Sequence, residues 1–108
     1  MLERLKFNAL FRSDLMSRKI EHFHAAKLTS IKKLNDIHRK DAESRKNYIG
    51  RHGEVYVLES EHRNPGSRYV YFTNHDDIRF STGYGSYTVE KNRLIMKTHN
   101  SIYEFELF

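Results

Sequence analysis

The sequence of 108 residues contains no cysteine, no tryptophan and a single proline. Without cysteine it has no disulfide framework, no thiolate zinc site and no thiol nucleophile, which fits a reducing, cytoplasmic location. No hydrophobic run approaches the roughly 20 residues of a membrane span, and residues 1–11 lack the apolar centre and cleavage site of a signal peptide. The length excludes a large multidomain enzyme, so we expect a single domain over residues 1–108.

The chain also lacks the glycine-rich motifs of nucleotide-binding and acyl-transfer sites. It has no Gly-x-x-x-x-Gly-Lys loop, no Gly-x-Gly-x-x-Gly fingerprint and no Gly-x-Ser-x-Gly elbow. The segment Gly83-Tyr84-Gly85 follows an expected strand but does not lead into a helix, so it offers no helix N-terminus to an anion. We therefore predict no cofactor and no catalytic residue.

Charge is plentiful, and its two signs are unevenly distributed. Residues 1–53 carry 13 Lys or Arg against 6 Asp or Glu, whereas residues 54–108 carry 6 against 8. A basic segment attracts polyanions and acidic surfaces. The alternative interpretation is a solvent-exposed helix face whose charges pair with one another, as Asp36 and Lys40 would at a spacing of four residues. The candidate residues for nucleic-acid binding are Arg18, Lys32, Lys33, Arg39 and Lys40.

The first half of the chain has the apolar spacing of an amphipathic helix. Ser13 is a suitable N-cap, and Asn47 followed by Gly50 is a suitable stop. Residues 1–49 are therefore predicted to form a helix or a helical hairpin, with a break near Thr29 as the main alternative. The apolar arc consists of Met16, Ile20, Phe23, Ile31, Leu34 and Ile37, with Leu28 at its edge.

After Gly53 the period changes from 3.6 to 2, and β-branched and aromatic residues become frequent, which predicts strands. Short connections such as Asn64-Pro65-Gly66 favour antiparallel neighbours. The fold class is therefore predicted as α+β, a basic helical half followed by a curved antiparallel meander of five to six strands over 54–108. The expected strands are 54–60, 68–73, 77–81, 86–91, 93–98 and 102–107.

Alternation divides these strands into two faces. The core face consists of Val55, Val57, Val70, Phe72, Ile78, Phe80, Tyr87, Val89, Leu94, Met96, Tyr103, Phe105 and Leu107. The other face is too apolar for ordinary solvent surface, so it must curl into a barrel, bind a partner or pair with a second copy of the chain. The candidate interface residues on it are Tyr56, Leu58, Tyr69, Tyr71, Ile95 and Ile102.

Within residues 69–107 an aromatic strand, a polar turn, a second strand, Gly-x-Tyr-x-Val and a hairpin follow one another. The residues that carry this order are Tyr71, Phe72, Ile78, Phe80, Gly85-Ser86-Tyr87-Thr88-Val89, Asn92, Leu94 and Tyr103-Glu104-Phe105. The order resembles the closing strands of small lipocalin-like meander domains. The family's opening Gly-x-Trp strand is missing, and the basic N-terminal half has no place in its pattern. The resemblance implies a meander topology and a binding function rather than catalysis.

Histidines supply the remaining chemical candidates. Residues 21–24, Glu-His-Phe-His, contain one Glu-x-x-His, a spacing used by di-metal helical bundles, and His38 with Asp41 is a partial echo. This ligand count is too small, so no metal site is predicted. Acid–base catalysis could use His62, His75, Asp76, Asp77 or His99, and a metal-independent ribonuclease could draw on histidines, Arg79 and tyrosines of the sheet. Residues 74–77 are better explained as a turn whose side chains satisfy backbone groups.

The tyrosines suggest one more surface. A stacking platform for unpaired bases would use Tyr56, Tyr69, Tyr71, Tyr84 and Tyr87 near Arg68 and Arg79, but strand-rich proteins also use Tyr for packing. One small core does not need both a basic amphipathic helix and a partly apolar second sheet face, so these surfaces are available for binding. We therefore predict a non-enzymatic binding or regulatory module that acts through a protein partner or self-association. Nucleic-acid binding through the basic half is the second hypothesis. A small barrel around an apolar ligand is the third.

Overall fold

The computed structural model describes residues 17–34, 45–60 and 67–108. Seven strands within these residues form one antiparallel sheet. A three-residue 3-10 turn, η1 (Lys46–Tyr48), lies between the first two strands. The strands are β1 (Ser17–Lys33), β2 (His52–Ser60), β3 (Arg68–Thr73), β4 (Arg79–Ser81), β5 (Gly85–Glu90), β6 (Arg93–Thr98) and β7 (Ser101–Leu107).

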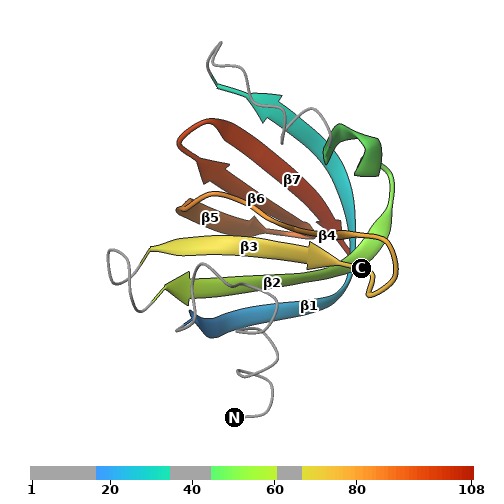
Figure 1. Ribbon diagram of the computed structural model, residues 1–108, viewed down its shortest axis with the longest axis horizontal. Coiled ribbons are helices and arrows are strands. Elements are labelled where there is room, and N and C mark those ends of the chain that lie inside the picture. The colour runs from blue at the N-terminus through green and yellow to red at the C-terminus, as the bar shows by residue number, and fades with distance from the viewer. Residues whose placement is uncertain (1–16, 35–44, 61–66) are drawn as a thin grey trace.

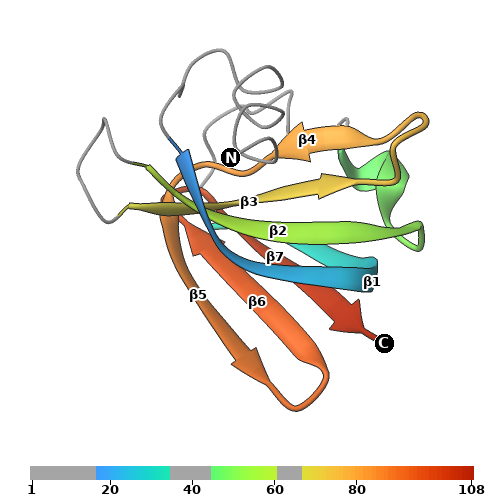
Figure 2. The same cartoon turned by 90° about the horizontal axis from the view of Figure 1, so that it is seen from below.

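The sheet closes on itself as a six-stranded barrel. Its strand order is β2-β1-β7-β6-β5-β3, and β3 pairs back with β2. The short strand β4 pairs with β3 on the same edge as β5, and β3 meets β5 through the single residue pair Arg68 and Gly85. Figures 1 and 2 show β2 and β3 along one side of the barrel and β5, β6 and β7 along the other, and the long strand β1 curves from β2 to β7. Closure leaves few unpaired strand edges.

The predicted N-terminal helix is wrong, and with it the α+β class. Ser17–Lys33 form β1, the longest strand, and η1 is the only helical element among the described residues. The parts of this prediction that concern residues 1–16 and 35–44 lie outside the described residues. No helix within the described ranges is long and apolar enough to cross a membrane.

Register shifts explain why this strand carries a helix-like pattern. β1 is irregular between Lys19 and Glu21, between Phe23 and Ala26, and between Leu28 and Ser30. Each bulge adds a residue to one strand, so the step between inward side chains becomes three residues instead of two. This spacing imitates the i, i+3 recurrence of a helix face. The β1 side chains that contribute to the barrel core are Ile20, Phe23, Ala26, Leu28 and Ile31.

The meander predicted after Gly53 is confirmed, and every strand end lies within two residues of its expected position. The predicted core face is confirmed as well, with one exception. Val89 is 42% exposed because it lies in the β5–β6 hairpin, which extends away from the rest of the barrel in Figure 2. Alternation therefore identified the correct face, but it carried no information on how far each strand extends beyond the barrel.

The interior of the barrel is filled by side chains. Phe72 and Phe105 are fully buried, with ring centroids 5.2 Å apart, and Phe80 lies 5.7 Å from Phe72. Leu94 and Met96 are also fully buried in the same cluster. Among the described residues, these apolar side chains occupy the space that a ligand at the barrel centre would need.

Candidate functional site

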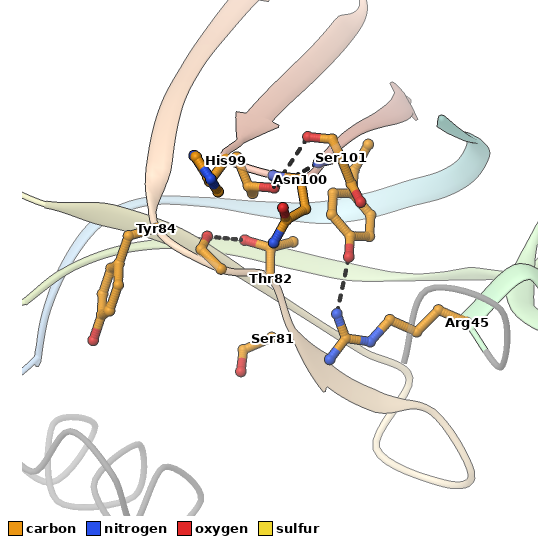
Figure 3. A pocket seen from close by; sticks show the side chains of 10 residues that line it. Arg45, Ser81, Thr82, Tyr84, His99, Asn100 and Ser101 are labelled. Carbon is orange, nitrogen blue, oxygen red and sulfur yellow. Dashed lines mark hydrogen bonds between the residues drawn. The ribbon is translucent and has the colours of Figure 1, made fainter. Parts of the chain in front are cut away.

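One end of the barrel carries a pocket of about 500 Å³. Three separate parts of the chain meet there: the residue before η1, the connection from β4 to β5, and the turn from β6 to β7 with the start of β7 (Figure 3). Pockets of 300 to 1,000 Å³ are typical of small-molecule sites. The lining residues are Arg45, Ser81, Thr82, Gly83, Tyr84, Thr98, His99, Asn100, Ser101 and Tyr103.

Arg45 places a positive charge in the wall of this pocket. Its Nη1 donates a hydrogen bond of 2.9 Å to the Tyr103 hydroxyl, as Figure 3 shows, and its guanidinium carbon lies 5.0 Å from the centre of the Phe80 ring. The Phe80 ring also stacks with the Tyr48 ring, and their centroids are 6.0 Å apart. Among the described residues no carboxylate pairs with Arg45. The hydrogen bond to Tyr103 and the contact with the Phe80 ring hold the guanidinium in the wall of the pocket.

Two threonines in the lining have structural roles. The Thr82 hydroxyl donates to the Gly83 carbonyl at 2.9 Å and accepts the backbone N–H of Val70 at 3.0 Å. The Thr98 hydroxyl donates to the Ser101 carbonyl and accepts the N–H of the same residue at 3.0 Å. These bonds fix the two turns that form the pocket. The other polar side chains of the lining are those of Ser81, Tyr84, His99, Asn100 and Ser101.

The predicted interface residues on β2 and β3 are brought together, but they are buried. Tyr56, Leu58, Tyr69 and Tyr71 form a second cluster outside the barrel interior and are between 0% and 8% exposed. The Tyr84 ring meets Tyr69 edge to face at 5.4 Å. Burial raises the pKa of Tyr71. A protein interface or a base-stacking platform on these rings would have to uncover them first, and both stay predictions.

The other two predicted interface residues lie elsewhere. Ile95 and Ile102 are half-buried on β6 and β7, which are neighbours in the sheet but are separate from the β2–β3 cluster. The structure therefore divides the six predicted residues between two places on the barrel. An interface through Ile95 and Ile102 also stays a prediction.

The predicted nucleic-acid residues do not form one patch among the described residues. Arg18 lies near the start of β1, is 60% exposed and pairs with Glu59. Lys32 and Lys33 are exposed at the far end of the same strand, where successive side chains point to opposite faces. Arg39 and Lys40 lie outside the described residues. Nucleic-acid binding stays a prediction.

The turn interpretation of residues 74–77 is confirmed. Asn74 Oδ1 accepts the backbone N–H groups of Asp76, Asp77 and Ile78 at 2.9 to 3.0 Å. The hydrogen bond from the Asn74 amide, reinforced by Arg51, lowers the pKa of Asp77. The acid–base candidates do not assemble into one site, because His99 lies in the pocket while Asp77 pairs with Arg51. His62 lies outside the described residues.

A histidine cluster forms on the outside of β1 and β2. His22 Nε2 lies 2.7 Å from Glu54 Oε1, and His24 Nδ1 lies 3.9 Å from the same oxygen. His75 Nε2 bonds the other carboxylate oxygen, and the Tyr56 hydroxyl donates to Oε1 at 3.2 Å. Burial raises the pKa of Glu54, but hydrogen bonds from the two histidines outweigh burial and hold it below its usual value.

Sequence reasoning missed the pocket, and it considered His22 and His24 but rejected a metal site there because the ligand count was too small. No local sequence pattern pointed to Arg45, because its partners Phe80 and Tyr103 lie far away along the chain. The pattern His22-x-His24 did carry a signal, since alternate residues of a strand share a face, but a helix was expected there. The geometry of these residues carries the functional argument, because comparisons with models of protein families, with curated proteins and with solved structures give no match.

Proposed function

We propose that this chain is a non-enzymatic binding protein that holds a small amphipathic anion in the pocket around Arg45. The observation that carries this proposal is a guanidinium fixed in the wall of a 500 Å³ hollow at the end of a packed barrel. The ligand's anionic group meets Arg45, and its apolar part meets the rings of Tyr84 and Tyr103. The barrel supplies a rigid frame for these groups.

Electrostatics favours an anion over a wholly apolar ligand. Arg45 contributes a positive charge to the lining of the pocket, and no acidic side chain is among the described residues of that lining. A carboxylate or phosphate can accept two parallel N–H bonds from one guanidinium. A wholly apolar molecule would remove water from Arg45 and from the neighbouring hydroxyls without replacing their hydrogen bonds, which is costly.

The lipocalin-like resemblance of residues 69–107 agrees with this proposal. A closed antiparallel barrel is compatible with that resemblance, which implies binding rather than catalysis. We propose a site at the end of the barrel because apolar side chains occupy the interior among the described residues. We therefore expect a ligand smaller than one that would occupy a barrel centre.

Isothermal titration calorimetry on the full chain tests the proposal with three probes: benzoate and laurate as anions, and benzyl alcohol as a neutral analogue. We expect saturable binding of at least one anion and at least tenfold weaker binding of the alcohol. The variant Arg45→Gln should lose at least tenfold in affinity, since hydrogen bonds to a charged group contribute about 1.5–3 kcal/mol. Arg45→Lys should retain part of it.

The matched control is Arg93→Gln, because Arg93 is an exposed arginine on β6 that pairs with Glu104 away from the pocket. It should bind the anion as the unmodified chain does. Equal affinity for benzoate and benzyl alcohol, or unchanged affinity in Arg45→Gln, would refute the proposal. So would the absence of saturable binding of both anions at millimolar concentration.

A further inference from the structure

We infer that the outside of β1 and β2 carries a binding site for a divalent transition-metal ion of the zinc class. Its ligands are His22 Nε2, His24 Nδ1 and a carboxylate oxygen of Glu54. These atoms all lie within 4.8 Å of one another. None of the three residues lines the pocket around Arg45, so this site is separate from the proposed ligand site.

The strand geometry brings the two histidines together. His22 pairs with Tyr56 on β2, and His24 lies in the irregular stretch between Phe23 and Ala26, where the register shift leaves its ring beside that of His22. Their ring centroids are 4.1 Å apart. Glu54 belongs to the same outward side of β2 as Tyr56. Two neighbouring strands thus direct three donor groups to one point.

The donor set selects the kind of ion. Two imidazoles and one carboxylate suit zinc and its transition-metal neighbours, and three protein ligands leave a fourth position for water. Magnesium and calcium prefer sites made of oxygen ligands alone. Zinc has no d-electron preference for geometry, so it tolerates a site that is built from side chains of two strands.

Only a small movement is needed to form the site. Tetrahedral bonds of about 2.0–2.1 Å place neighbouring ligand atoms about 3.4 Å apart. His22 is already closer than this to Glu54, and His24 lies 3.9 Å from the same oxygen. The His24 side chain is 85% exposed, so it can rotate toward the ion without disturbing the core. The His22 and Glu54 side chains are 15% and 23% exposed, which shelters the site but leaves it accessible.

Two further residues position these ligands. The His22 ring stacks on Tyr56, with centroids 4.0 Å apart and ring planes 10° apart. His75 bonds the second oxygen of Glu54, and its own backbone N–H is held by the Thr73 hydroxyl at 2.9 Å. Such outer partners orient metal ligands, and their loss typically costs 10- to 100-fold in affinity. His75 is therefore a positioning residue for Glu54.

Zinc titration of the full, chelator-stripped chain by calorimetry tests the site, with cobalt absorption spectra as a second readout. We expect saturable binding at a ratio of one, and intense visible cobalt bands typical of four-coordinate geometry. His24→Gln and Glu54→Gln should each weaken zinc binding at least tenfold, whereas the control His99→Gln should not. Because His24 is exposed, its variant cannot lose binding through unfolding.

His75→Gln separates positioning from a structural role. It should weaken zinc binding while leaving the urea midpoint of the metal-free chain unchanged. Zinc affinity that is the same in His24→Gln as in the unmodified chain would overturn the inference. The absence of saturable zinc binding at 1 mM, or equal binding of magnesium, would also overturn it.

Discussion

The Tyr87 hydroxyl on β5 donates a hydrogen bond to the Glu21 carboxylate on β1. These two strands are not neighbours in the sheet, so the bond connects parts of the barrel that no backbone pairing joins. The Arg68 guanidinium carbon lies 5.7 Å from the centre of the Tyr87 ring, and Arg68 belongs to the single residue pair that joins β3 to β5. This polar group therefore lies beside the place where a single residue pair joins β3 to β5.

The Tyr87–Glu21 bond predicts a loss of stability in alkaline solution. Burial and the neighbouring Glu21 carboxylate raise the pKa of Tyr87 from 10.0 to about 12. The unfolded chain therefore loses this proton first. The resulting stabilisation is complete below pH 10 and falls as the pH rises from 10 to about 12. Urea unfolding should show this decline, and Tyr87→Phe should reduce its slope.

Tyr48→Phe serves as the control for that experiment, because Tyr48 packs on Phe80 away from Glu21. It should keep the slope of the unmodified chain between pH 10 and 12. Identical slopes for Tyr87→Phe and the unmodified chain would mean that the bond to Glu21 does not contribute.

We predict that a side chain at Gly85 would disturb the pairing of β5 with β3 and β6. A Cβ atom there would lie 2.8 Å from the Lys97 carbonyl carbon and 2.9 Å from the Thr98 Cα, both backbone atoms that cannot rotate away. Gly85→Ala should lower the free energy of unfolding by about 1–3 kcal/mol. Gly83→Ala is the matched control, since its nearest atom is the Thr98 Cβ at 3.8 Å. Equal unfolding midpoints for Gly85→Ala and Gly83→Ala would contradict the pairing of Gly85 with β6.

Two leucines of the first half distinguish a strand from a helix. A helix would bury Leu34 within its apolar arc and leave Leu28 at the edge. In the barrel Leu28 is 0% exposed and Leu34 is 44% exposed. Leu28→Ala should therefore cost about 2–5 kcal/mol, whereas Leu34→Ala should stay within about 0.5 kcal/mol of the unmodified chain. The reverse order in chemical denaturation would favour the helix.

Much of the second half of the fold could be predicted from the sequence. Period-2 alternation gives the strands after Gly53 and the core face from Val55 to Phe105, because these strands run regularly between short turns. β1 could not be predicted in this way. Its bulges change the step between Phe23 and Ala26 to three residues, and the pattern then matches a helix.

The candidate sites could be predicted only in part. His22 and His24 were noticed, but their carboxylate partner Glu54 and its second histidine, His75, come from other strands and a turn. Only the closed sheet brings them together. Arg45 likewise reaches its pocket through contacts with residues more than 30 positions away, which local patterning does not encode.

The most direct test of the account is a ¹H–¹⁵N NMR titration of the full chain with benzoate. We predict saturable shifts in the backbone signals of Thr82, Gly83, Asn100 and Ser101, which line the pocket, and at least a tenfold weaker response in Arg45→Gln. Signals from the far β5–β6 hairpin, such as Lys91 and Asn92, should not move. Shifts that are absent, that are centred on that hairpin, or that persist unchanged in Arg45→Gln would contradict anion binding at the end of the barrel.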